Sequence, residues 1–118
     1  MNAKSILYVL QQPPYLNDRV FEAFDALLVA AAFEQRVSLL FRGAGVAQLL
    51  SRQAPSNTRN LAKILTSLDA YEVTEIYADS SAFATLGLST NDCTITPKLV
   101  HAEEIAALIN AQDVVLSD

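Results

Sequence analysis

Three neighbouring polar residues, Asp79, Ser80 and Ser81, could carry nucleophilic chemistry, because they follow a predicted strand over residues 73–78. A parallel-sheet enzyme holds a nucleophile at such a position, where the dipole of the following helix favours an anion. A serine nucleophile also needs a positioned base, and the only histidine of the chain, His101, is predicted at the start of a different helix. Because Ser and Asp are strongly preferred at helix N-caps, we expect these three residues to cap a helix.

Cys93 is the only cysteine, and it lies beside the polar stretch 89–92. Asp92 is expected to raise the pKa of the thiol and no cation adjoins it in sequence, so we interpret Cys93 as an unreactive thiol. One thiol and one imidazole cannot form a disulfide, a zinc cage or an iron-sulfur cluster, and His101, which precedes two glutamates, is expected to belong to a helix start. We therefore predict no catalytic, cofactor-binding or metal-binding residue in this chain.

The loops that follow the predicted strands are the places where an open parallel sheet holds a ligand, and these are residues 11–17, 42–45 and 79–81. The first loop contains two prolines and no glycine. It therefore lacks the row of backbone amides that a phosphate-binding loop provides, which disfavours nucleotide or flavin binding. Tyr15 and Leu16 in this loop are candidate contacts for another subunit, because tyrosine is enriched where proteins bind one another.

Length and composition restrict the class of protein. The chain has 118 residues, of which 52% are apolar, and this fits a single domain over residues 1–118. Its formal net charge is -5 and its eight basic residues are scattered, which disfavours direct binding to nucleic acid. No apolar run reaches the roughly 18 residues that cross a bilayer and the first residues lack the pattern of a secretory signal, so we expect a cytoplasmic protein without membrane contact. Only 18% of the residues are charged, which indicates that a partner covers part of the surface.

The apolar pattern predicts alternating strands and helices. Short apolar runs at 6–10 and 37–41 are typical of strands that are buried on both faces. Apolar residues recur at helical spacing over 20–31, where Phe21, Phe24 and Leu28 are assigned to the core. Further strands are predicted at 73–78, 94–96 and 114–116, and further helices around 46–50, from a cap at Ser56 or Asn57 to Leu68, from 79 to 87 and from 101 to 112.

Strands separated by helices predict crossover connections and right-handed βαβ units. The expected fold class is therefore α/β, with three layers: a mainly parallel sheet with helices on both faces, flavodoxin-like in architecture. Neither a repeat of fixed period nor a low-complexity segment interrupts this pattern.

Several segments resemble the TusC/DsrF family of the DsrE/DsrF/DsrH-like superfamily. They are DALLVAAAF at 25–33, VSLLF at 37–41, GVAQLL at 45–50 and the ending DVVL at 113–116. The similarity spans nearly the whole chain in order and spacing, and its most specific segment is Gly-Val-x-Gln-Leu-Leu.

The resemblance implies that the chain is one subunit of a TusBCD-type sulfurtransferase complex, a heterohexamer with two copies each of three related subunits. Its partners would be TusB-like and TusD-like subunits, and the complex would also meet TusA-like and TusE-like proteins. Such a complex relays persulfide sulfur from a cysteine desulfurase for 2-thiouridine formation at the wobble position of certain transfer RNAs. The sulfur-carrying cysteine belongs to the TusD-like subunit.

The resemblance also implies where a carrier cysteine would lie, namely at the end of a central strand just before a helix. Here this position corresponds approximately to Asp79, Ser80 and Ser81. A carboxylate and two hydroxyls cannot form a persulfide, so we expect a structural subunit that is not itself catalytic.

Three alternatives stay open. A DsrF-type subunit in dissimilatory sulfur oxidation would have the same architecture. A sulfur carrier would use Cys93, the sole thiol, to accept sulfane sulfur. A flavodoxin-like ligand binder is suggested by the topology alone and would hold a chromophore or a nucleotide.

Overall fold

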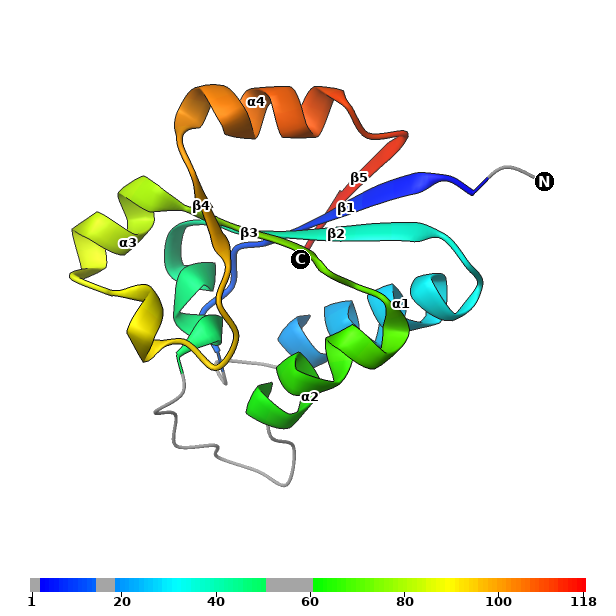
Figure 1. Ribbon diagram of the computed structural model, residues 1–118, viewed down its shortest axis with the longest axis horizontal. Coiled ribbons are helices and arrows are strands. Elements are labelled where there is room, and N and C mark those ends of the chain that lie inside the picture. The colour runs from blue at the N-terminus through cyan, green and yellow to red at the C-terminus, as the bar shows by residue number, and fades with distance from the viewer. Residues whose placement is uncertain (1–2, 15–18, 51–60) are drawn as a thin grey trace.

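The computed structural model describes residues 3–14, 19–50 and 61–118. Its strands are β1 (Ser5–Leu10), β2 (Arg36–Phe41), β3 (Glu75–Asp79), β4 (Lys98–Val100) and β5 (Val114–Ser117). Its helices are α1 (Arg19–Ala32), α2 (Leu61–Ser67), α3 (Ser80–Leu86) and α4 (Ala102–Asn110), with short 3-10 helices η1 (Gly43–Leu49), η2 (Leu68–Tyr71) and η3 (Thr90–Asp92). Strands and helices alternate along the described chain, as the sequence predicts (Figure 1).

The five strands form one sheet in the order β4-β3-β2-β1-β5, and every pairing between them is parallel. β1 lies between two neighbours, with its Leu7 beside Ser38 of β2 and Val115 of β5. The chain therefore steps from β1 to β4 in one direction and then crosses back over the sheet to reach β5. The expected mainly parallel sheet is confirmed.

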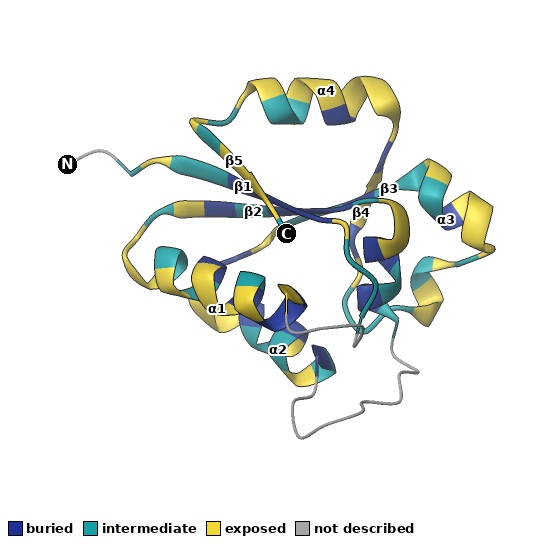
Figure 2. Ribbon diagram, turned by 180° about the vertical axis from the view of Figure 1, so that it is seen from behind, coloured by how far each residue is buried: buried dark blue, intermediate teal, exposed yellow. Residues whose placement is uncertain are grey.

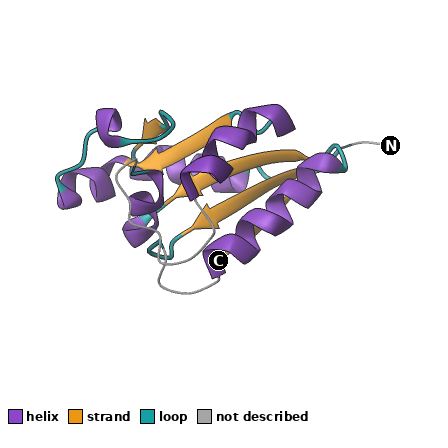
Figure 3. Ribbon diagram, turned by 90° about the horizontal axis from the view of Figure 1, so that it is seen from below, coloured by secondary structure: helices purple, strands orange, loops and turns teal. Residues whose placement is uncertain are grey.

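Helices cover both faces of the sheet, which gives the expected three layers. α4 lies on one face, and α1 and α2 lie on the other (Figure 1); Figure 3 shows the strands behind α1 and α2. Side chains alternate between the faces along β1, because successive residues of a strand point to opposite sides. Tyr8 and Leu10 join the larger hydrophobic core against α1 and α2, whereas Leu7 and Val9 join the smaller core under α4. The buried residues lie mainly along the strands and on the inward sides of the helices (Figure 2).

The strand predicted at 94–96 is wrong, because the fourth strand begins after Pro97. The backbone N–H of Thr94 donates to the Leu49 carbonyl at 2.7 Å, and Cys93 forms an isolated antiparallel bridge with Leu50. These bonds hold the segment against the end of η1 and away from β3. Proline has no backbone N–H to donate to a ladder, so the pairing with β3 starts at Lys98.

The apolar pattern predicted that the third strand begins at Val73. In the structure the strand begins two residues later, at Glu75. Glu72 ends η2 in the left-handed conformation with a φ of 61°, and the Val73 N–H donates to the Leu68 carbonyl at 3.0 Å. Val73 therefore belongs to the helix end, although its side chain is buried in the core as the pattern suggested.

Every helix within the described ranges is too short or too polar to cross a bilayer.

Candidate functional site

The segments that directly follow β1, β2, β3 and β4 lie at one edge of the sheet, because parallel strands all end on the same side. We call this edge the carboxyl rim, and its described members are residues 11–14, 42–45 and 79–81 together with His101. In Figure 1 the starts of α3, η1 and α4 gather at this edge. Tyr15 and Leu16, the predicted partner contacts of the first loop, lie outside the described residues.

Gly45 allows η1 to lie directly against the end of β1. A Cβ atom at this position would be 1.9 Å from the Leu10 carbonyl oxygen, so no other residue fits without moving the backbone. The same carbonyl accepts a hydrogen bond from the Arg42 N–H at 3.0 Å, and the buried Gln48 donates its Nε2 to the Gln12 carbonyl at 2.7 Å. The first two loops of the carboxyl rim are therefore held together by one backbone hydrogen bond, by the close approach of Gly45 and by the Gln48 side chain.

Asp79 is the N-cap of α3, as the sequence predicts. Its Oδ1 atom accepts hydrogen bonds from the Ser81 backbone N–H at 3.0 Å and from the Ser81 hydroxyl at 2.9 Å. Gly87 ends the helix in the left-handed conformation with a φ of 66°. The carboxylate and one of the two hydroxyls are thus used to start the helix.

Ser80 does not share this capping role, because it contacts His101. The distance between its Oγ atom and Nδ1 of His101 is 2.9 Å, which is a hydrogen bond. His101 does start a different helix, α4, as predicted, and it nevertheless lies within hydrogen-bond distance of this serine. Asp79 pairs with Val100 in the β3–β4 register, so the next residue of each strand, Ser80 and His101, also become neighbours.

The Ser80–His101 pair can orient a proton but cannot carry sulfur. Its hydrogen bond fixes the direction of the imidazole ring, and His101 is exposed to solvent. The Glu104 carboxylate holds the start of α4 by accepting the His101 backbone N–H at 3.1 Å. A hydroxyl oxygen cannot form a persulfide, so the described part of the carboxyl rim contains no group that accepts sulfane sulfur.

A mostly apolar pocket of about 390 Å³ lies between η1 and the start of α3. Gly43, Ala44, Ala82 and Leu86 line it, and Asp79 and Ser81 are among its polar lining residues. Asp79 Oδ1 and the Ser81 hydroxyl already bond to each other, so the pocket offers a mainly apolar surface.

Cys93 lies between η3 and β4, in the loop after α3, and is half-buried. Its Sγ atom is 3.8 Å from the Ser89 carbonyl oxygen, to which the thiol donates a weak hydrogen bond. Burial raises the pKa of the Cys93 thiol above its ordinary value, and the negative charge of Asp92 raises it further. The predicted direction of the Asp92 effect is confirmed, although burial is the larger cause. The thiol is therefore largely protonated, and less reactive than an exposed cysteine, at neutral pH.

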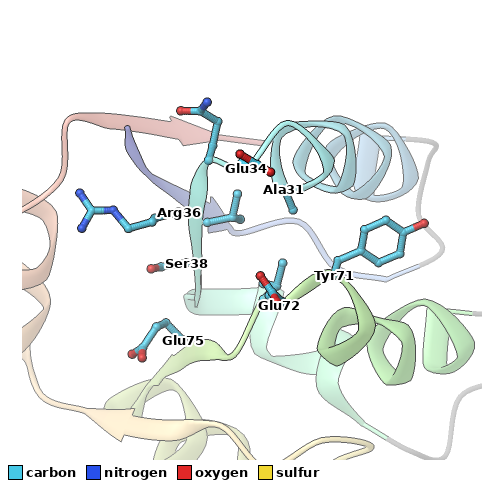
Figure 4. A pocket seen from close by; sticks show the side chains of 10 residues that line it. Ala31, Glu34, Arg36, Ser38, Tyr71, Glu72 and Glu75 are labelled. Atoms are coloured by element: carbon cyan, nitrogen blue, oxygen red, sulfur yellow. The ribbon is translucent and has the colours of Figure 1, made fainter. Parts of the chain in front are cut away.

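A second cavity of about 400 Å³ lies at the opposite edge of the sheet, near the amino ends of β2 and β3 (Figure 4). Glu34, Glu72 and Glu75 bring carboxylates to its lining, and Arg36 and Tyr71 contribute a guanidinium and an aromatic ring. Among the residues that the structure describes, no group of three or more His, Cys, Asp or Glu side chains could hold a metal ion. The lining of this cavity is therefore charged, but the described residues do not form a metal-binding group there.

Comparison with known proteins identifies a family and several relatives that resemble this chain over most of its length. The model of the DsrE/DsrF-like family matches residues 4–117. A protein TusC homolog of Vibrio parahaemolyticus is 29% identical over 102 residues, which cover 85% of this chain and 86% of the relative. The intracellular sulfur oxidation protein DsrF of Allochromatium vinosum is 33% identical over 91 residues, which cover 75% of this chain and 67% of the relative.

The fold has a close counterpart among solved structures. The crystal structure of the ychN protein from E. coli matches with a TM-score of 0.85 over 98% of this chain and 99% of that chain, at 20% sequence identity. The resemblance drawn from the apolar segments is confirmed by the family match, which extends from the residue before β1 to the last residue of β5. The chain belongs to the DsrE/DsrF-like family.

Proposed function

We propose that this chain is a non-catalytic subunit of a TusBCD-type sulfur-relay complex, which passes persulfide sulfur on for 2-thiouridine formation at the tRNA wobble position. Its partners in a heterohexamer are TusB-like and TusD-like subunits, and TusA-like and TusE-like proteins meet the complex. Similarity to TusC homologs across most of the chain supports this proposal.

One structural observation carries the non-catalytic role. Persulfide relay requires a thiolate that attacks the terminal sulfur of a donor persulfide, forms a new S–S bond and releases the donor thiolate. At the position that the resemblance assigns to a carrier cysteine, the chain has Asp79, Ser80 and Ser81, whose oxygens already bond to one another or to His101. The sole thiol, Cys93, lies in a different loop with a raised pKa.

The test is reconstitution with the three subunits together. The chain is co-expressed with a TusB-like and a TusD-like protein, and the assembly is measured by gel filtration with light scattering. We expect a stoichiometric heterohexamer. After incubation with a persulfide donor, intact mass spectrometry is expected to find the added sulfur on the TusD-like subunit and not on this chain. A chain that remains a lone monomer beside both subunits would refute the proposal.

A DsrF-type role is the second candidate, favoured by the 33% identity to the sulfur oxidation protein DsrF. The same assembly would then serve oxidative sulfur metabolism. Deleting the chain in its host separates the two roles, because loss of 2-thiouridine from tRNA indicates the first and impaired sulfur oxidation indicates the second.

A carrier role for Cys93 is tested in the same mass experiment. A mass gain of one sulfur atom that disappears in Cys93→Ser would support it, whereas an unmodified chain would discard it. The raised pKa of this thiol argues against the role, because only the thiolate attacks a persulfide. An ultraviolet-visible spectrum of the purified chain tests the ligand-binding alternative, since a bound flavin absorbs where tyrosine does not.

A further inference from the structure

One face of the sheet owes its helix cover to α4, whereas several elements cover the other face (Figure 1). The larger core includes buried side chains from α1, α2, α3, η1 and η2. Among the described residues, the smaller core consists of Leu7, Val9, Leu40, Val100 and Ile105, and of these only Ile105 belongs to a helix, which is α4. The apolar residues of β1 and β2 on this face are therefore shielded from water mainly by one helix.

α4 is held to the sheet by little apolar burial. Of its nine residues only Ile105 is buried, and Leu108 and Ile109 are partly buried against the smaller core. The other residues of α4 are exposed, as the yellow segments of this helix show in Figure 2. By comparison, α1 on the opposite face buries four residues. Because the local stability of a segment depends on its buried apolar contacts, α4 should open more easily than α1.

α4 is also too short to persist as a helix away from the sheet. Isolated helices of fewer than about 12 residues are marginal in water, and α4 has nine. Its hydrogen bonds include those from the Ile105 N–H to the His101 carbonyl at 2.9 Å and from the Ala111 N–H to the Ala107 carbonyl at 3.1 Å. Detachment of α4 should therefore break these bonds and expose the backbone amides of the helix in one step.

The strands on either side of α4 are fixed to the sheet by contacts that the helix does not provide. Before α4, the Ser80 hydroxyl oxygen is 2.9 Å from Nδ1 of His101, which links the end of β4 to the end of β3. After α4, the Asp113 N–H donates to the Ser5 carbonyl at 3.1 Å, and the Asp113 carboxylate accepts the Ser5 N–H at 2.8 Å. Both flanking strands can therefore stay paired when the helix detaches.

We propose that α4 is a lid that detaches from the sheet and unwinds as one unit while β4 and β5 stay paired. Opening uncovers Leu7, Val9 and Leu40, which lie on the α4 side of β1 and β2. β1 and β2 have neighbouring strands on both sides, so this apolar floor lies in the interior of the sheet. The larger core stays closed during this motion, because no residue of α4 belongs to it. The inference is independent of the sulfur-relay proposal.

The first test is amide hydrogen exchange of the isotope-labelled full chain, measured by nuclear magnetic resonance at low urea concentrations. We expect the bonded amides of α4 to exchange about 100-fold faster or more than those between β1 and β2, with a smaller dependence on urea because opening exposes less surface. The amides of Asp113 and Asp118, which bond to β1, should be better protected than those of α4. Leu65→Ala, in the larger core, should accelerate exchange in β1 and β2 by about tenfold or more and leave exchange in α4 unchanged.

The second test uses two adjacent residues of β2 that face opposite sides of the sheet. Leu39 and Leu40 are both 0% exposed, and Leu39 belongs to the larger core whereas Leu40 belongs to the smaller one. Each is changed to Cys in a Cys93→Ser background, and the rate of alkylation by iodoacetamide is measured. The thiol of Leu40→Cys should react about 100-fold faster or more than that of Leu39→Cys, because opening of α4 uncovers only the first of these positions.

Three results would overturn the proposal. Amides of α4 that share the protection and urea dependence of β1 and β2, or that accelerate equally in Leu65→Ala, would mean that the helix opens only on global unfolding. Equal protection of the α4, Asp113 and Asp118 amides would mean that β5 opens together with the helix. Equal alkylation of the two thiols would mean that the floor under α4 is not uncovered. If either cysteine variant fails to fold, the exchange pattern of the native chain decides the question without it.

Discussion

A thiol placed at Ser80 should be activated by His101, which makes the geometry of the carboxyl rim directly measurable. The change is Ser80→Cys in a Cys93→Ser background, so that the introduced thiol is the only one. The Ser80 hydroxyl oxygen is 2.9 Å from the imidazole Nδ1, so a sulfur atom there could transfer its proton to the ring and form an ion pair. An opposite charge at this distance lowers the pKa of an acid by about 1 to 3 units.

The expected magnitude follows from that shift. A fall of about two units from the ordinary thiol value of about 8.5 corresponds to about 2.7 kcal/mol and raises the thiolate fraction at pH 7 from about 3% to about 75%. The weaker nucleophilicity of a low-pKa thiolate offsets much of this gain. At about pH 6 the net alkylation rate with iodoacetamide should still be about tenfold higher than for a thiol of ordinary pKa.

The assay is the ultraviolet absorbance of the thiolate as a function of pH, together with the alkylation rate. The matched control also carries His101→Gln, which removes the imidazole and keeps a polar side chain. The reasoning is refuted if the thiol titrates at the same pH with and without His101. Equal titration of the thiol in the variant and in its His101→Gln control would mean that no hydrogen bond holds the side chains at positions 80 and 101 together in solution.

Three further predictions concern the elements that build the rim and the sheet. Gly45→Ala should destabilise the fold by about 3 kcal/mol or more, because the new methyl would overlap the Leu10 carbonyl oxygen, and an unchanged urea midpoint would contradict this contact. Asp79→Ala should destabilise the fold by about 1 kcal/mol through loss of the N-cap of α3, with Asp79→Asn largely retaining it, as measured by thermal melting. Hydrogen bonds from the Ser5 backbone and side chain hold the pKa of Asp113 below its ordinary value, so its stabilising effect should be present above pH 4 or so and should be lost as the pH falls through the lowered pKa. Asp113→Asn should remove this part of the acid destabilisation in urea titrations from about pH 7 to about pH 2, and an identical pH profile for both proteins would argue against the bond to β1.

The strands buried on both faces could be predicted from sequence because their apolar runs are nearly unbroken. Leu7 and Val9 face α4 while Tyr8 and Leu10 face α1 and α2, so every residue in the run needs an apolar side chain. The same reasoning failed for β4, whose three residues are too few to show a period. The strand was predicted instead at residues 94–96, because Thr94, Ile95 and Thr96 have the composition of a strand. In the structure a backbone hydrogen bond from Thr94 to Leu49 at the end of η1 holds this segment away from the sheet.

The Ser80–His101 contact was missed for a different reason. The two residues are 21 positions apart, and no local pattern links them. Their contact depends on the pairing of β3 with β4 and on its register, which is a long-range property of the sheet. The sequence does indicate that Ser80 and His101 each directly follow a strand. This would predict their contact only if the two strands were already known to be neighbours in the sheet.

The Ser5–Asp113 bonds join residues that are 108 positions apart, and this separation has a consequence for biosynthesis. With translation at about 5 to 20 residues per second, β1 waits roughly 5 to 20 seconds for the strand that completes its second side. During that interval the most apolar strand of the sheet has an open flank inside the cell. Factors that shield nascent chains on the ribosome are therefore expected to matter more for the yield of this protein than for one whose first strand lies at an edge.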